Sequence, residues 1–338
     1  MTTAWPAGAV SRAVQAAQPP VAAASRLHQL DHHERGLPQV LAESSESAVL
    51  ASPEQVQGGL EAVSYLADAE TASIVYLAGQ LSKPLLIEGP AGTGKTQLAK
   101  SVSEMTGYPL VRLQCYEGLD ESRAIYEWNY RKQLLRISAQ QAAEDAPGQA
   151  WADVRDNIFS EEFLLERPLL AAIRAKQRVV LLIDEVDRLD VETEALLLEV
   201  LSEFQVTIPE LGTVHATTIP LIFLTSNNFR ELSEALKRRC LFLYMGYPDV
   251  DRERQIIQAK LPGLPASAAE QASRVVEGLR RLDLKKPPSV AETLDWAHSL
   301  LLAGVGEIGS HHVRAGLPVL LKHQADIAVA REHLDPAD

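Results

Sequence analysis

The sequence predicts an α/β protein, in which a parallel sheet is covered by helices on both faces and is followed by a smaller helical unit. Three observations lead to this prediction. Apolar segments alternate with amphipathic ones, as strands joined by crossover helices do. The apolar segments are continuous runs, which is typical of strands buried on both faces. The chain has 338 residues. A single hydrophobic core usually supports a shorter chain than this, so two packed units are expected.

The composition is that of an ordinary folded protein, with 46% hydrophobic and 23% charged residues. A formal net charge of -13 argues against nucleic acid as the main ligand, because nucleic-acid binding uses clustered Lys and Arg. No apolar run approaches the roughly 18 residues that a membrane span needs. The two cysteines, Cys115 and Cys240, fit core positions in a reducing compartment. We therefore expect a cytoplasmic protein without a membrane span.

The N-terminal segment differs from the rest of the chain. It is rich in Ala, Ser, Pro and Gln, and no acidic residue precedes Asp31. A targeting leader is one interpretation, although the segment has no continuous apolar stretch. We expect residues 1–50 to be disordered or loosely docked.

Five apolar runs are expected to form the sheet. In chain order they are Pro84–Gly89, Pro109–Gln114, Val179–Asp184, Ile219–Ser226 and Cys240–Met245. Ligands of open parallel sheets bind at the carboxyl ends of the strands. The polar residues that end or follow these runs are therefore the candidates for a functional site.

The first expected strand leads into a phosphate-binding loop, GPAGTGKT. Its residues are Gly89, Pro90, Ala91, Gly92, Thr93, Gly94, Lys95 and Thr96. Glycines let the backbone wrap around phosphate, and the N-terminus of the following helix, expected to end at Gly107, favours an anion. Lys95 is expected to hold the β and γ phosphates and the Thr96 hydroxyl to ligate Mg²⁺. The alternative is a glycine turn that binds nothing, which the flanking strand and helix argue against.

Two adjacent acids, Asp184 and Glu185, stand at the end of the third expected strand. Asp184 is placed to hold Mg²⁺, and Glu185 to polarise a water for attack on the γ phosphate, because metal binding and water activation need separate carboxylates. The alternative is a charged loop at a helix start, which the upstream P-loop disfavours. The expected cofactors are ATP and Mg²⁺.

Two further polar features follow the acid pair. Asn227 ends the fourth expected strand, where its amide would help to position the attacking water; a turn asparagine is the alternative. Lys237, Arg238 and Arg239 form a basic cluster at the end of an expected helix. This cluster either interacts favourably with the negative end of the helix dipole or supplies an arginine to the nucleotide of a neighbouring subunit.

Two segments exceed what a minimal nucleotide-binding unit requires. Tyr116–Leu135 carries four aromatic residues in a chain that is only 5% aromatic, which indicates a packed insert or a contact surface, with local packing favoured. Phe204–Pro220 has β-branched residues on either side of ELGT and predicts a hairpin.

These motifs, in this order, resemble those of AAA+ ATPases and, more narrowly, of the MoxR branch. The resemblance runs from about Ser52 to Gln324. The phrases RLQCYEGLD, YEWNYRKQLL, LEVLSEFQVTIPELGT and KPPSVAETLDW are similar to the subgroup that accompanies molybdenum-containing carbon monoxide dehydrogenase and related hydroxylases. The resemblance implies a RecA-like core at 51–248, with a helix 2 insert and a hairpin before sensor 1, and a helical lid at 249–338.

The resemblance also implies residue roles and partners. Asn227 would be sensor 1 and Arg239 the arginine finger of a homo-oligomeric ring, with a hexamer as the expected form. The partners would be a protein with a von Willebrand A type domain and a client metalloenzyme. Relatives usually offer an arginine as sensor 2 where this chain has Ser289. Lys285 and Lys286 are the nearby substitutes, and sensor 2 is left unassigned.

Three functions follow from the sequence. The leading hypothesis is an ATPase that remodels a client protein or assists its maturation; the resemblance implies that this client is a molybdenum-containing dehydrogenase such as carbon monoxide dehydrogenase. A nucleic-acid motor or clamp-loader-like ATPase is the second, which the acidic charge balance disfavours. A nucleotide switch without hydrolysis is the third, and Glu185 argues against it.

Overall fold

The computed structural model describes residues 50–143 and 158–334 of the chain. Apart from Leu50, the predicted N-terminal segment lies outside these residues, so what we expect of it stays a prediction. The described part begins with two helices, α1 (Pro53–Ala62) and α2 (Ala69–Leu81), which pack on each other before the first strand.

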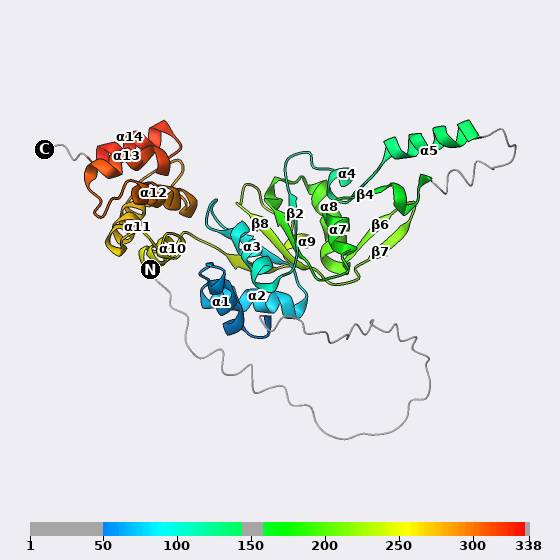
Figure 1. Ribbon diagram of the computed structural model, residues 1–338, viewed down its shortest axis with the longest axis horizontal. Coiled ribbons are helices and arrows are strands. Elements are labelled where there is room, and N and C mark those ends of the chain that lie inside the picture. The colour runs from blue at the N-terminus through cyan, green and yellow to red at the C-terminus, as the bar shows by residue number, and fades with distance from the viewer. Residues whose placement is uncertain (1–49, 144–157, 335–338) are drawn as a thin grey trace, which may run out of the picture. The chain divides into compact units, whose positions relative to one another are not determined.

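A five-stranded parallel sheet forms the centre of the fold (Figure 1). Its strands are β1 (Leu85–Glu88), β2 (Leu110–Gln114), β5 (Val180–Asp184), β8 (Leu221–Ser226) and β9 (Leu241–Tyr244). They lie in the order β2-β5-β8-β1-β9, and each neighbouring pair is parallel. All five runs predicted as strands are confirmed, and so is the α/β fold class.

The expectation that every strand is buried on both faces is wrong for the two edges of the sheet. β5 and β8 are buried along their whole length, whereas β2 and β9 expose residues such as Leu110 and Phe242. An edge strand has a neighbour on one side only and receives less cover from the helices. This position explains why β2 accommodates Arg112 and Gln114.

Helices cover the sheet on both faces and form two hydrophobic cores. On one face, α1, α2 and α3 (Lys95–Thr106) pack against strand side chains that include Phe223. On the other face, α7 (Pro168–Ile173) and α8 (Val191–Glu203) pack against the alternate side chains, among them Leu224. Successive residues of a strand point to opposite faces, so both cores depend on the same continuous apolar runs.

A hairpin occupies the segment for which the sequence predicts one. β6 (Gln205–Ile208) and β7 (Gly212–His215) pair antiparallel. Val206 and Ile208 are buried in the core that α7 and α8 share. These two side chains anchor the hairpin to the body of the domain.

The insert after β2 is larger than the predicted Tyr116–Leu135. It contains α4 (Glu121–Ala124), β3 (Tyr126–Trp128), α5 (Tyr130–Ala143), a 3-10 turn (Glu161–Phe163) and β4 (Leu164–Glu166). β3 and β4 pair antiparallel and close the base of the insert. Trp128 is buried there, whereas Tyr130 on α5 is 62% exposed. The aromatic cluster therefore serves local packing in part and stays on the surface in part.

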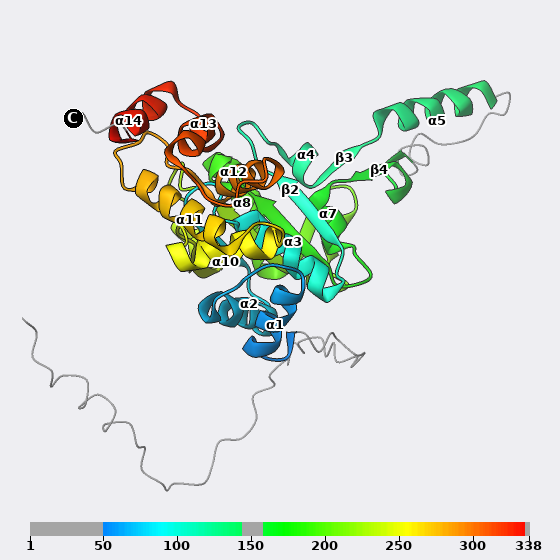
Figure 2. The same ribbon diagram turned by 60° about the vertical axis from the view of Figure 1, so that its left-hand side comes forward.

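A helical unit follows β9 and confirms the expected C-terminal helical domain (Figure 2). Its helices are α10 (Val250–Lys260), α11 (Ala266–Arg280), α12 (Val290–Leu302), α13 (Ser310–Leu320) and α14 (Gln324–Leu334). Trp296 is buried at its centre, and Gly316 lets α13 approach, since a Cβ at that position would lie 2.1 Å from the indole nitrogen. The exact boundary at residues 248 and 249 stays a prediction.

A buried ion pair ties two helices of this unit together. The Arg280 guanidinium donates two hydrogen bonds of 2.8 Å to the Glu253 carboxylate, which joins α11 to α10. Among residues 50–143 and 158–334, all helices fall short of the length and apolar character that crossing a bilayer would require.

Candidate functional site

The loop between β1 and α3 has the backbone geometry that phosphate binding requires. Gly89, Gly92 and Gly94 have φ angles of 151°, 76° and 102°, which residues with side chains rarely adopt. A Cβ at Gly89 would lie 2.0 Å from the carbonyl oxygen of Met245, so only glycine fits there. α3 begins at Lys95 directly after the loop, and its unpaired backbone N–H groups favour an anion.

Lys95 is folded back onto the loop that precedes it. Its side chain is buried, and the ammonium donates to the carbonyl oxygens of Gly89 at 2.7 Å and Pro90 at 2.6 Å. Burial lowers the pKa of Lys95, and the carboxylates of Asp187 and Asp184 oppose that shift. The same ammonium can exchange these carbonyl oxygens for the oxygens of a bound phosphate.

We expect the Lys95→Ala variant to lose on the order of 10- to 100-fold in ATP affinity, because a charge-assisted bond to phosphate is worth about 1.5–3 kcal/mol. Equilibrium titration with a fluorescent ATP analogue measures the change. Lys176→Ala is the matched control, since it removes one cation from an exposed position that does not line the cavity. Unchanged affinity in Lys95→Ala would remove the P-loop assignment.

Asp184 lies at the centre of a network of donors at the end of β5. Its Oδ1 accepts from the hydroxyls of Thr96 at 2.8 Å and Thr225 at 2.5 Å. Its Oδ2 pairs with the Arg112 guanidinium at 2.5 Å. The two residues predicted to hold Mg²⁺, Thr96 and Asp184, are thus in direct contact, and their hydroxyl and carboxylate oxygens are the ligand type that Mg²⁺ prefers.

Sequence reasoning did not identify Thr225 and Arg112 as members of the site. The sequence did contain a signal for Arg112. A cation in the middle of a mostly apolar strand needs a polar partner, which points to a nearby acid. Thr225 precedes the end of β8 and resembles an ordinary buried strand residue. Its role becomes visible only once β8 and β5 are known to be neighbours.

We expect Arg112→Gln to lower the Mg²⁺ concentration needed for half-maximal ATP binding by roughly tenfold, because it removes a positive charge from beside Asp184, the predicted metal ligand. Fluorescent ATP binding is titrated with MgCl₂ to measure it. Arg131→Gln on the exposed face of α5 makes the same charge change far from Asp184 in the sequence and serves as control. An unchanged Mg²⁺ requirement would show that the guanidinium does not compete with the ion.

Glu185 has a backbone conformation that turns it out of the strand. Its φ of 57° is left-handed, an uncommon state for glutamate that the surroundings must support. Part of that support is a 2.9 Å hydrogen bond from its N–H to the Thr225 hydroxyl. The side chain is 40% exposed and lines the same cavity as Asn227.

Asp187 fixes the loop on which Asn227 lies. The carboxylate is buried, and its Oδ2 accepts from the backbone N–H groups of Asn227 at 3.1 Å and Phe229 at 2.7 Å. Its Oδ1 has no hydrogen-bond partner among the described residues. In the sequence, Asp187 is the final acid of DEVD, and the predicted site gave it no role. An acid without a role beside the acid pair was the signal that could have identified it.

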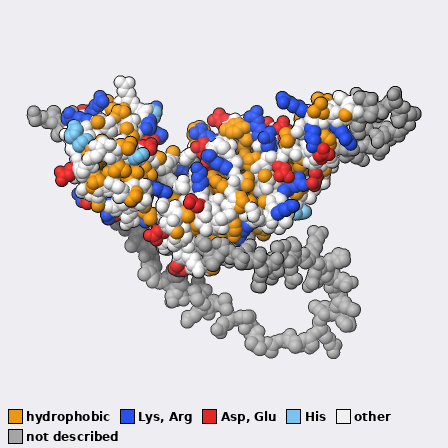
Figure 3. Space-filling view, in the orientation of Figure 1, with side chains coloured by type: hydrophobic (Ala, Val, Ile, Leu, Met, Phe, Trp, Pro, Cys, Tyr) orange, Lys and Arg blue, Asp and Glu red, His pale blue; other side chains and the backbone are white. Residues whose placement is uncertain are grey.

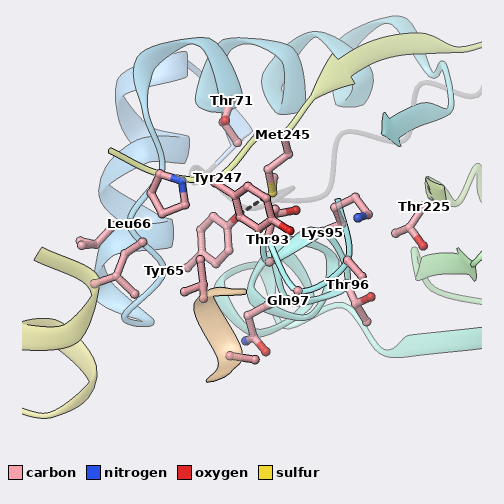
Figure 4. A pocket seen from close by; sticks show the side chains of 18 of the residues that line it. Tyr65, Leu66, Thr71, Thr93, Lys95, Thr96, Gln97, Thr225, Met245 and Tyr247 are labelled. Carbon is pink, nitrogen blue, oxygen red and sulfur yellow. Dashed lines mark hydrogen bonds between the residues drawn. The ribbon is translucent and has the colours of Figure 1, made fainter. Parts of the chain in front are cut away.

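One cavity of about 640 Å³ is lined by six of the polar residues described above: Lys95, Thr96, Asp184, Glu185, Thr225 and Asn227. Figure 4 shows Lys95, Thr96 and Thr225 at one end and Tyr65, Leu66 and Tyr247 toward the other. The Tyr65 hydroxyl donates to the Met245 sulfur at 3.8 Å, and burial raises the pKa of this tyrosine. A charged end beside a largely apolar end, in a volume typical of ligand pockets, suits a nucleotide with its phosphates toward Lys95.

The helical unit also contributes to this cavity. Arg252, Lys260 and Val290 are among the lining residues. Ser289 caps α12 and packs so closely on the P-loop that a Cβ at Gly92 would lie 2.3 Å from its hydroxyl. Lys285 and Lys286, the substitutes that the sequence offered for sensor 2, are not among the lining residues, whereas Arg252 and Lys260 are.

The basic cluster lies apart from the cavity of its own chain. Arg239 donates from Nε to the Ser202 hydroxyl and from Nη1 to the carbonyl of Ala235 at 2.8 Å. Arg238 has an 81% exposed side chain with Glu234 at 3.9 Å. Neither arginine lines the cavity that contains Lys95.

Several known proteins are similar to parts of this chain. An uncharacterized protein of Staphylococcus aureus is 27% identical over 208 residues, which cover 60% of this chain and 70% of that protein. An uncharacterized protein of Staphylococcus epidermidis is 28% identical over 190 residues, covering 54% and 63%. The RuvB Holliday junction branch migration motor of Thermotoga maritima is similar at a TM-score of 0.43 and 16% identity, over 81% of this chain and 72% of that one. Residues 84–240, which carry the P-loop and the acid pair, match the model of the AAA domain, dynein-related subfamily.

Proposed function

We propose that the protein is a Mg²⁺-dependent AAA+ ATPase that works as a ring with catalytic sites shared between adjacent subunits. The observation that carries this proposal is a single cavity lined by Lys95, Thr96, Asp184, Glu185 and Asn227. Lys95 and Thr96 begin α3, Asp184 ends β5 with Glu185 after it, and Asn227 follows β8. They supply separate groups for phosphate, metal and water, which a site that only stored nucleotide would not need.

Each group has a task in phosphoryl transfer to water. Lys95 and the N-terminus of α3 bind the phosphates, and Thr96 with Asp184 would hold Mg²⁺, which neutralises charge on the phosphate oxygens. Glu185 accepts a proton from the attacking water, as its partial exposure to the cavity allows. Asn227, held by Asp187, orients that water.

The ring proposal rests on the place of Arg239. The transition state gathers negative charge on the γ phosphate, and AAA-type sites need an additional cation there. Arg239 is presented away from its own cavity, so it would serve the nucleotide of a neighbouring subunit. A hexamer is the form that the MoxR resemblance implies.

We further propose a protein client. The MoxR-like phrases of the sequence support remodelling of a molybdenum-containing dehydrogenase, such as carbon monoxide dehydrogenase, together with a von Willebrand A type partner. Lys, Arg, Asp and Glu side chains are interspersed on the face that Figure 3 shows, and the net charge is -13. Both features favour a protein client over a nucleic-acid track.

Phosphate release from ATP tests the enzymatic part of this proposal. The purified full chain should hydrolyse ATP with Mg²⁺ and stop when EDTA is added. Saturable ATP binding without phosphate release would support a nucleotide switch instead. A salt-dependent rise in hydrolysis with added DNA would support a nucleic-acid motor.

The client is tested in cells that lack this chain. The dehydrogenase polypeptide should accumulate there with an incomplete metal centre, measured by metal analysis of the purified enzyme. Restoring the parent chain, but not Glu185→Gln, should complete the centre. A normal metal content without this chain would remove the dehydrogenase from the proposal and leave the ATPase untouched.

A further inference from the structure

The segment between β8 and α9 (Glu234–Lys237) connects the water-orienting residue of one site to the arginine offered to the next. Asn227 stands at its start, and Arg239 follows α9 by two residues. Asp187 fixes the first part of this segment through the backbone of Asn227 and Phe229. The second part is fixed by another acid, which the proposed chemistry does not use.

This second acid is Glu194, in the first turns of α8. Its side chain is 1% exposed. One carboxylate oxygen accepts from the Arg230 guanidinium at 2.6 Å and the other from the backbone N–H of Ser233 at 2.9 Å. Arg230 also donates through Nε to the carbonyl of Leu189 at 2.6 Å. A buried carboxylate is stable only with such partners, so Glu194 fixes the segment at two points.

The hydrogen bonds of Glu194 with Arg230 and Ser233, called the clamp below, act on the start of α9. Ser233 is the N-cap of this helix, and its hydroxyl accepts from the backbone N–H of Leu236. The backbone N–H of Arg239 in turn donates to the carbonyl of Leu236 at 3.1 Å. The Arg239 side chain reaches Ser202 in the last turn of the same helix, α8. The two ends of α8 therefore hold the segment that presents Arg239.

We propose that Glu194 is a positioning residue for the arginine finger, because its clamp on Arg230 and Ser233 sets the place from which Arg239 reaches the adjacent subunit's ATP. This inference rests on the proposed ATPase function. It predicts a division of labour between two buried acids. Asp187 acts on the site of its own chain through Asn227, and Glu194 acts on the site next to it.

The change Glu194→Gln keeps the size of the side chain but turns one acceptor into an NH₂ donor that faces another donor. We expect hydrolysis to fall on the order of 10- to 100-fold, as a displaced catalytic group causes, with ATP affinity within about twofold of the parent. Mixing with Lys95→Ala protein should restore activity, since the Lys95→Ala subunit offers a well-placed Arg239 to the ATP held by Glu194→Gln. Asp187→Asn, which perturbs its own site, should not be restored by the same partner.

Two further variants keep the test sharp. Glu192→Gln makes the same chemical change at an exposed position of α8 and should hydrolyse ATP like the parent. Arg230→Lys keeps the charge beside Glu194 but loses the forked contact, so it should repeat the restorable defect if Glu194→Gln does not fold. Melting curves identify variants that are unfolded.

The outcomes separate this inference from the function beneath it. A folded Glu194→Gln that hydrolyses ATP like the parent overturns the inference alone. So does a defect that Lys95→Ala does not restore, when Lys95→Ala does restore Arg239→Ala. If Arg239→Ala is not restored either, the shared site and this inference fall together. A parent chain without ATPase activity overturns the proposed function itself.

Discussion

The Arg239→Ala variant is expected to bind ATP almost normally and to hydrolyse it roughly 10³- to 10⁵-fold more slowly, the range for arginines that stabilise phosphoryl transfer in a partner's site. Binding is preserved because Arg239 does not line the cavity of its own chain. The rate falls because the neighbouring transition state loses a cation at the point where negative charge gathers. Equilibrium binding of a fluorescent ATP analogue and phosphate release measure the two effects separately.

A mixture of Arg239→Ala with Lys95→Ala protein gives the decisive control. At an interface where Lys95→Ala donates the arginine and Arg239→Ala holds the ATP, the site is complete, so activity should return. Arg238→Ala is the matched variant, since it removes the adjacent and highly exposed arginine of the same cluster. If subunits exchange and no activity returns, Arg238 or a structural role for the cluster becomes the better explanation.

We expect Glu185→Gln to slow hydrolysis by roughly 10²- to 10⁴-fold while ATP stays bound. The amide keeps the size of the side chain but cannot accept a proton from water. Phosphate release and fluorescent ATP binding give the two quantities, and the oligomer should grow when ATP is added, because the nucleotide persists at the interface. Glu203→Gln, an exposed acid at the end of α8, is the control. Turnover like that of the parent would show that another group activates the water.

The sequence predicts those parts of the site that are continuous in the chain. The P-loop follows from glycine spacing between a strand and a helix, and Asp184 with Glu185 follows from an apolar run that ends in two acids. Thr225 and Arg112 could not be predicted in the same way, since their importance depends on which strands lie on either side of β5. Local sequence carries no information about that order.

The same limit applies to the fold. Continuous apolar runs predict strands, and all five are present, but the runs do not show which strands lie at the edges. The partial exposure of β2 and β9 follows from the order β2-β5-β8-β1-β9. Glu194 is a further case, because a glutamate in a helix normally predicts a solvent-facing residue. Its burial depends on Arg230, which lies in a different part of the chain.

The close approach of Gly89 to Met245 has a consequence for how this chain can evolve. Gly89 opens the P-loop, and Met245 begins the short connection from β9 to the helical unit. Under the proposed function, position 89 is therefore constrained twice, once by phosphate binding and once by the backbone that follows the neighbouring strand β9. In a descendant that no longer bound ATP, the constraint from phosphate binding would be lost, but the constraint from the Met245 backbone would remain. Glycine would then be retained at position 89 for steric reasons alone, even after Lys95 and Glu185 had been replaced by other residues.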